Sequence, residues 1–135
     1  MKTKAIMVVL ITSFMAFSFT FKSNYQKKPW VIPDVAKNKK NPVANDAAAI
    51  GTGKALWSTH CKSCHGAKGL GDGPKAAQLK TEVEDLTTAD AQSVTDGTFF
   101  YQISEGHEDM PAFKKKIPDE DDRWSLVNFM RSLKK

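Results

Sequence analysis

Five consecutive residues, CKSCH at positions 61–65, have the types and spacing needed for one particular chemistry. Cys61 and Cys64 are separated by two residues, and His65 follows the second cysteine directly. Two thiols at this spacing can each add to one vinyl group of a haem, and the histidine then lies where its imidazole can bind the iron. The sequence therefore predicts one covalently attached haem c.

A second axial ligand must reach the opposite face of such a haem. His60 adjoins the first cysteine and lies on the same side as the motif, and Met130 falls in a regular apolar pattern that suits a core position. His107 and Met110 lie about 45 residues downstream, far enough for the chain to cross the ring. Pro111 restrains the backbone beside Met110, and histidine with methionine is the usual axial pair on a haem attached in this way. This favours Met110, with His107 as the alternative.

The N-terminal residues 1–23 differ in composition from the rest of the chain. Lys2 and Lys4 precede an apolar run over residues 5–21. This pattern is typical of a secretory signal peptide, and cleavage after Ser18 would leave small residues at both specificity positions. The run also nearly reaches the length of a membrane span, so an uncleaved anchor is the alternative. In both cases the domain would be exported, and we expect a periplasmic location.

Other uses of the two cysteines fit the sequence less well. A disulfide between Cys61 and Cys64 would close a very small ring and restrain little chain. A zinc site would need a second pair of ligands, and His60 and His65 lie too close to the thiols to complete a tetrahedron. Covalent haem attachment takes place outside the bacterial cytoplasmic membrane, so the N-terminal segment and the motif support each other.

The charge balance does not indicate a nucleic-acid partner. The formal net charge of +5 falls to +2 if Lys2, Lys4 and Lys22 are removed with the N-terminal segment. No basic stripe alternates with aromatic residues. Three lysines at 114–116 could steer an acidic partner surface, but a solvated run is the simpler interpretation, since acidic residues lie just upstream.

Residues 24–45 are rich in lysine, asparagine and proline and have no helical period, which predicts an extended lead-in or tether. Residues 30–32 form an apolar cluster within it. This cluster either pins the lead-in against the domain or belongs to a flexible linker. We expect the folded domain to cover residues 46–135.

The first main helix is expected from Ala47 to about His60. Asp46 is a suitable N-cap, and Ile50, Gly53 and Trp57 fall on one face. Glycine in a helix costs about 1 kcal/mol relative to alanine, and close approach of another helix could offset that cost.

Between the motif and the C-terminus the sequence predicts loops and two further helices. Four glycines over residues 66–73 indicate an irregular loop that can bring backbone carbonyls close to His65. A short helical turn is expected at 75–79, followed by loop. Thr95 is a suitable cap for a helix through Ser104 that ends at Gly106.

The last helix is expected to begin with Pro118 in its first position, with acidic residues 119–122 at the positive end of its dipole. Trp124 lies on another side of this helix from its main apolar stripe, so the helix has apolar contacts in more than one direction. The stripe consists of Leu126, Phe129, Met130 and Leu133.

Taken together, these motifs resemble those of class I cytochromes c of the bacterial monohaem type over about residues 47–133. The matching segments are GKALWSTHCKSCHG, GLGDGP, TDGTFFYQISEG, DMPAF and RWSLVNFMRSL. The resemblance implies an all-α cytochrome c fold, with three main helices and shorter helical pieces around one haem.

The resemblance also assigns roles to individual residues. It implies thioether bonds at Cys61 and Cys64, with His65 as the proximal ligand and Met110 as the distal ligand. The backbone carbonyl of Pro74 would then accept a hydrogen bond from the His65 imidazole. In the first helix, the positions of Gly53 and Trp57 would pack across the terminal helix against Leu126 and Phe129.

The function expected from these residues is one-electron transfer by an exported monohaem carrier, not catalysis. Two axial protein ligands leave no open iron position, whereas a haem sensor or a peroxidase-like enzyme would need one. We expect a monomer that meets redox partner proteins and contacts a membrane only if residues 1–23 remain. The alternative is a bound electron-accepting subunit of a periplasmic dehydrogenase or oxidase.

Overall fold

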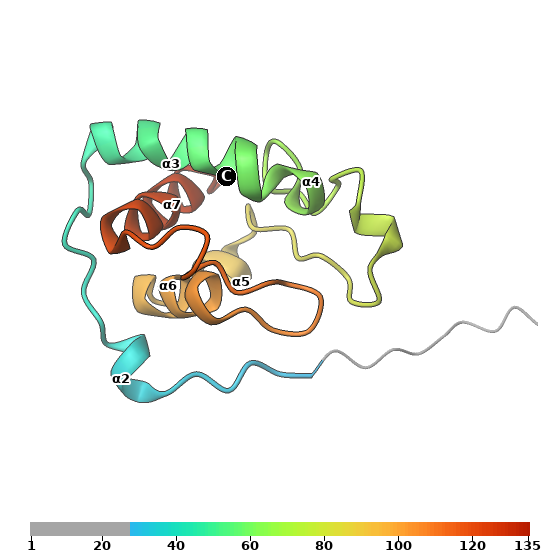
Figure 1. Ribbon diagram of the computed structural model, residues 1–135, viewed down its shortest axis with the longest axis horizontal. Coiled ribbons are helices and arrows are strands. Elements are labelled where there is room, and N and C mark those ends of the chain that lie inside the picture. The colour runs from blue at the N-terminus through green and yellow to red at the C-terminus, as the bar shows by residue number, and fades with distance from the viewer. Residues whose placement is uncertain (1–27) are drawn as a thin grey trace, which may run out of the picture.

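The computed structural model describes residues 28–135, and the expected signal peptide or anchor lies outside this range. The described chain is helical and contains no β-strand, which confirms the all-α prediction (Figure 1). None of its helices has the length and apolar character needed to cross a bilayer. The elements in order are α2 (Asp34–Lys37), α3 (Ala47–His60), α4 (Lys62–His65), the 3-10 helix η1 (Ala76–Gln78), α5 (Ala89–Gln92), α6 (Asp96–Glu105) and α7 (Glu120–Ser132).

Helices α3 and α7 form the central contact of the domain and lie directly against each other (Figure 1). The backbones meet at Gly53, where an added Cβ atom would overlap the carbonyl oxygen of Ser125. One turn later, the Trp57 ring packs against Phe129 with their centroids 5.5 Å apart. The expected contact of Gly53 and Trp57 with the terminal helix is therefore confirmed, and Leu126 is buried in the same core.

The start of α3 and both ends of α6 follow from local sequence, as expected. The Asp46 carboxylate accepts hydrogen bonds from the first backbone N–H groups of α3, including that of Ala48 at 2.8 Å. The Thr95 hydroxyl accepts from the Thr98 N–H in the same way at the start of α6. At the far end of α6, Gly106 has a φ of 66°, a conformation that favours glycine.

The predicted start of the last helix was wrong. Asp119 is the N-cap of α7, and its carboxylate accepts from the Asp121 N–H at 2.9 Å, so Pro118 precedes the helix. A capping carboxylate satisfies a free N–H group, which proline in the first turn cannot do. The Arg123 guanidinium also donates to the carbonyls of Ile117 and Pro118, and this holds the preceding turn in place.

Helix α7 is enclosed on several sides, as its sequence predicts. Its residues from Arg123 to Met130 are all buried. On the side away from α3, the Trp124 ring stacks on Phe100 of α6 at a centroid distance of 4.0 Å. The helix therefore joins the α3 layer to the α6 layer.

The lead-in packs against the domain and contains a short helix, α2, that its sequence does not indicate. An added Cβ atom at Gly97 of α6 would overlap the carbonyl oxygen of Ala36, so these two segments are in close contact. The Thr95 hydroxyl also donates to the Lys37 carbonyl at 2.7 Å. Helices of four residues, such as α2 and α5, are too short to produce a recognisable period.

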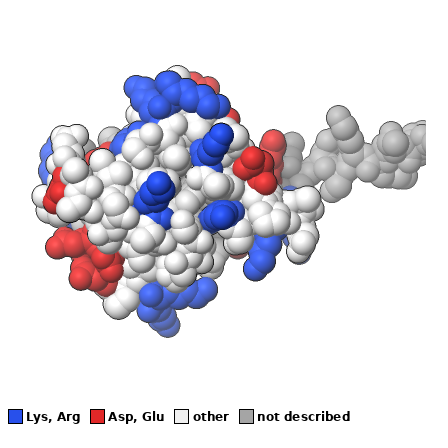
Figure 2. Space-filling view, turned by 90° about the horizontal axis from the view of Figure 1, so that it is seen from above, with Lys and Arg blue, Asp and Glu red and all other residues white. Residues whose placement is uncertain are grey.

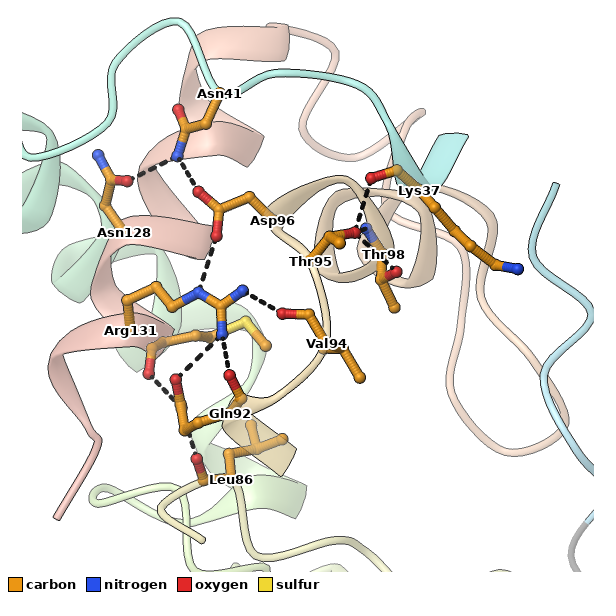
Figure 3. Close-up of polar contacts among 11 residues, drawn as sticks. Lys37, Asn41, Leu86, Gln92, Val94, Thr95, Asp96, Thr98, Asn128 and Arg131 are labelled. Carbon is orange, nitrogen blue, oxygen red and sulfur yellow. Dashed lines mark hydrogen bonds and ion pairs between the residues drawn. The ribbon is translucent and has the colours of Figure 1, made fainter. Parts of the chain in front are cut away.

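Side-chain hydrogen bonds hold the segment between α2 and α3 to the rest of the domain (Figure 3). The Asn41 amide donates to Asp96 of α6 at 3.2 Å and to Asn128 of α7 at 2.8 Å. Asp96 in turn accepts from Arg131 at 2.7 Å. A single polar network therefore joins the lead-in, α6 and α7.

The two glycines of α3 provide a direct test of the helix crossing. Gly53→Ala should destabilise the protein by about 1–3 kcal/mol, because the new methyl group overlaps the α7 backbone. Gly51→Ala is the matched control, since a Cβ atom there meets nothing within 4 Å. The control should raise stability by up to about 1 kcal/mol. Urea unfolding followed by circular dichroism measures both, and equal effects of the two variants would contradict the crossing.

Candidate functional site

The CKSCH motif lies at a bend between two helices. Cys61 ends α3 and begins α4, and its N–H donates to the Trp57 carbonyl at 2.9 Å. The carbonyl of Cys61 then accepts from the N–H groups of Cys64 and His65, at 3.1 Å and 3.0 Å. Both thiols and the imidazole are therefore carried by one short helical turn, directly attached to the helix that packs on α7.

The glycine-rich loop folds back onto this turn. Gly71 N–H donates to the His65 carbonyl at 2.9 Å, and Gly73 N–H donates to the Cys64 carbonyl at 3.1 Å. An added Cβ atom at Gly73 would lie 2.6 Å from the Cys64 backbone, so only glycine permits this approach. The Trp57 indole also donates to the Gly66 carbonyl at 2.9 Å. The glycine-rich loop therefore holds the CKSCH turn through backbone hydrogen bonds, and Trp57 holds the start of that loop.

A cavity of about 410 Å³ opens in front of the motif. Both cysteines, His65 and Met110 line it, so the structure brings the predicted attachment residues and the predicted axial ligands to one space. Pro74 is not among its lining residues; it lies in the chain between Gly73 and Lys75, whose N–H groups donate to carbonyls of the motif. Apolar residues that line the cavity include Trp30, Trp57, Leu86, Ile103, Phe113, Leu126 and Met130.

Met110 is presented by a tight turn whose residues also line the cavity. His107 and Met110 exchange two backbone hydrogen bonds, at 2.8 Å and 2.9 Å. Glu108 within the turn has a φ of 51°, an unusual conformation for a residue other than glycine. The turn is thus a defined structure that fixes the position of the methionine.

Asp109 joins this turn to the neighbouring segment of chain. Its carboxylate accepts from the backbone N–H groups of Lys80 and Thr81, both at 2.8 Å, and from the Thr81 hydroxyl at 3.0 Å. These hydrogen bonds, chiefly those from Thr81, hold the pKa of Asp109 below its ordinary value of 3.8. The carboxylate is therefore most effective as a clamp when it is charged.

His107 also lines the cavity, but its ring is engaged elsewhere. Its Nε2 atom lies 3.2 Å from the Lys28 carbonyl oxygen, and its ring packs against Trp30 with centroids 4.8 Å apart. A carbonyl oxygen can only accept, so a hydrogen bond there requires the proton to be on Nε2. The other two sequence candidates, His60 and Met130, line the cavity from the α3 and α7 walls.

The thiols are free and are not placed to bind a metal ion. Burial raises the pKa of the Cys61 thiol to about 12, and the neighbouring Cys64 adds to this shift. A thiol of this kind differs from the low-pKa cysteine of a redox-active pair. Among residues 28–135, no three histidine, cysteine or acidic side chains come together as a metal site.

Comparison with known families and structures identifies this arrangement. The family described as cytochrome C oxidase, cbb3-type, subunit III matches residues 48–130, which is more than half of the chain. The chain belongs to this family of c-type cytochromes. The match covers α3 except its first residue, the motif, the residues that line the cavity other than Trp30, and most of α7.

Two solved structures are similar to this cytochrome. One is a chain of the Kuenenia stuttgartiensis reducing HAO-like protein complex Kustc0457/Kustc0458, with a TM-score of 0.61 and 24% identity, covering 81% of this chain and 52% of that chain. The other is the KustC0563 c-type cytochrome, with a TM-score of 0.55 and 32% identity, covering 62% of this chain and 98% of that one. The cytochrome thus spans about half the length of the first. A search of curated proteins finds no match.

The cofactor implied by the family is covalently bound haem c, and the cavity fits it. The volume is within the range of cofactor sites, and the walls combine apolar side chains with a similar number of polar and charged ones. The two thiols can form the covalent bonds to the haem vinyl groups, and the imidazole and the thioether are side chains able to ligate its iron. Cys61, Cys64, His65 and Met110 would hold the group, which supplies an iron that carries one electron.

Three features of the site could not be found from sequence. Each is a contact that exists only once the chain has folded. They are the hydrogen bond from the Trp57 indole to Gly66, the Asp109 clamp, and the packing of Trp30 against His107. Asp109 is one of several acidic residues near the lysine run, and its sequence context gives no sign of a partner 28 positions away.

The Asp109 clamp predicts a pH-dependent stability difference. Because the folded-state pKa of Asp109 is lowered, its contribution is present above the ordinary value of 3.8 and is lost as pH falls through the lowered pKa. At neutral pH, Asp109→Asn should lower the urea midpoint of the haem-loaded protein. The difference from the parent should shrink below about pH 4.

The control for this prediction is Asp90→Asn, which alters an exposed carboxylate in α5 that is not part of the Met110 turn. It should change the urea midpoint less at neutral pH. A difference between Asp109→Asn and the parent that stays constant down to pH 2 would contradict the clamp.

Proposed function

We propose that this cytochrome is an exported one-electron carrier with a single haem c attached through Cys61 and Cys64. His65 and Met110 are its axial ligands. The observation that carries this proposal is the single cavity lined by the two cysteines, the histidine and the methionine. With both axial positions filled by the chain, no iron position is open to a substrate, so electron transfer is the use that remains.

The surrounding residues support the ligation by fixing each ligand before the iron is bound. On the histidine side, we assign the Pro74 carbonyl as the acceptor for the His65 imidazole. Gly73 and Lys75, on either side of Pro74, donate to the carbonyls of Cys64 and Ser63 at 3.1 Å and 2.8 Å. Such an acceptor fixes the orientation of the ring and raises the basicity of the ligating nitrogen.

On the distal side, the contacts of His107 favour Met110. The Nε2 atom of His107 faces the Lys28 carbonyl, where it serves as a donor, so only the Nδ1 atom of this ring keeps a lone pair for iron. The Met110 thioether has no competing role of this kind and is held by a turn of defined geometry. A thioether ligand stabilises ferrous iron, so we expect a higher reduction potential than a second histidine would give.

We infer an extracytoplasmic, periplasmic location and redox proteins as partners of a monomer. Haem is attached to such motifs outside the cytoplasmic membrane, which agrees with the secretory pattern at residues 1–23. Lysine and arginine side chains are spread over the face on the α3 side, with uncharged surface between them (Figure 2). Of the lysine run, Lys114 pairs with Glu105 and Lys116 lies over the Phe113 ring. Neither feature resembles a nucleic-acid surface.

The axial assignment is tested by visible spectra of Met110→Ala in both redox states. Loss of the thioether should convert a low-spin six-coordinate spectrum to one with an open position, lower the reduction potential, and allow rapid CO binding to the ferrous form. His107→Ala is the matched control from the same turn, and it should keep the parent's low-spin spectrum. An unchanged spectrum in Met110→Ala together with a changed one in His107→Ala would assign His107 as the ligand.

A second candidate is a bound electron-accepting subunit of a dehydrogenase or oxidase. Two observations favour considering it: the matched family is described by an oxidase subunit, and one similar structure is a chain of a protein complex, 52% of which this chain covers. Size-exclusion chromatography of the native protein, from separated membrane and soluble fractions, distinguishes the two. A diffusing carrier should elute at monomer size from the soluble fraction, whereas a subunit should elute with its complex.

A further inference from the structure

Residues 28–43 of the lead-in run along α6 and α7 and reach the Met110 turn; we refer to this segment as the strap. At one end, the Val43 carbonyl accepts from the Asn128 amide of α7. At the other end, Trp30 lines the cavity. Figure 1 shows this path, from the start of α3, past α2 beneath α6, and on below the loop that follows α6. The family match begins only at residue 48, so it does not include the strap.

The middle of the strap is fixed by contacts of several kinds. The Lys39 ammonium group lies 2.9 Å from the Glu120 carboxylate and 4.4 Å from the centroid of the Phe100 ring. Gly97 permits the backbone of α2 to touch α6. Asn41 donates to both Asp96 and Asn128 (Figure 3). With the middle anchored in this way, the position of residues 28–32 is determined by the domain.

The anchored strap places Trp30 against the turn that presents Met110. The indole packs on the His107 ring at a centroid distance of 4.8 Å, and the Lys28 carbonyl lies 3.2 Å from His107 Nε2. His107 is bonded to Met110 through two backbone hydrogen bonds. On the other side of the same turn, Asp109 accepts three hydrogen bonds from Lys80 and Thr81. The turn is therefore held from two sides.

We propose that the strap keeps the Met110 turn closed over the haem cavity and that Trp30 is the positioning residue through which it acts. This inference rests on the proposed ligation by Met110. For the thioether to leave the iron, the turn must move, and movement of His107 breaks its contact with Trp30. The strap therefore opposes replacement of Met110 by an external ligand, and it does so without touching the iron.

The proposal predicts how readily imidazole binds to the ferric protein. An aromatic contact of this kind is worth a factor of about three to ten in an equilibrium. Trp30→Ala should therefore increase the apparent affinity for imidazole by about three- to tenfold, while the low-spin spectrum without imidazole is retained. Trp30→Phe keeps an aromatic ring and should restore most of the parent's resistance to imidazole.

Val31→Ala is the control for the strap itself. Val31 is the next residue and is 85% exposed, so its truncation removes no packing against the turn. Its imidazole affinity should equal that of the parent. Equal affinities for the parent, Trp30→Ala and Val31→Ala, all with native circular dichroism, would overturn the proposal.

A double variant separates positioning of Met110 from simple shielding of the cavity. In Met110→Ala there is no thioether to displace, so adding Trp30→Ala should leave the imidazole affinity unchanged within about twofold. A three- to tenfold increase that persists in this background would mean that Trp30 only restricts access, and would overturn the positioning role. If the parent binds imidazole as tightly as Met110→Ala does, the ligation itself fails, which is a different outcome from a failure of the strap.

Discussion

At Gly53 the backbones of α3 and α7 lie so close that a single methyl group would overlap the carbonyl of Ser125. The CKSCH turn continues directly from α3, and α7 forms a wall of the cavity through Leu126 and Met130. The separation of these two helices therefore determines where the thiols and the imidazole lie relative to the opposite wall. Trp57 connects the helix crossing to the motif turn, because its ring packs on Phe129 of α7 while its N–H donates to the Gly66 carbonyl in the glycine-rich loop.

The second layer of the domain is attached to α7 by apolar packing, as in the stack of Trp124 on Phe100, and by polar groups at its edge. The Arg131 guanidinium donates to the carbonyls of Gln92 and Val94 and to Asp96, and it lies over the Phe99 ring (Figure 3). The partly buried Arg131 side chain thus provides hydrogen-bond donors for acceptors at the end of α5 and at the start of α6. Because charge-assisted hydrogen bonds are short and directional, they fix the angle of α6, whose Ile103 and Gln102 face the cavity.

How far sequence could predict this structure depended on the range of each interaction. Asp46 and Thr95 are caps whose partners lie within three residues, so both helix starts were predicted correctly. Pro118 was misplaced because Asp119, the next residue, is a better cap. The candidate haem residues came from a short motif and a ligand preference, which need no knowledge of the fold. The path of the lead-in could not be predicted, since it depends on Asn41 meeting a residue 87 positions away.

The strap and the helices that it contacts lie at opposite ends of the described chain, which affects the order in which these contacts can form. The strap contacts α6 and α7, the last helices of the chain, so those contacts can form only when the C-terminal segment has been made and folded. Contacts between residues distant in sequence are also the slow ones, because closing a long loop costs entropy before any packing is gained. Cys61 and Cys64, by contrast, sit on a local helical turn. The turn that carries the two thiols is thus built from contacts local in sequence, whereas the strap can take its place only against the last helices of the chain.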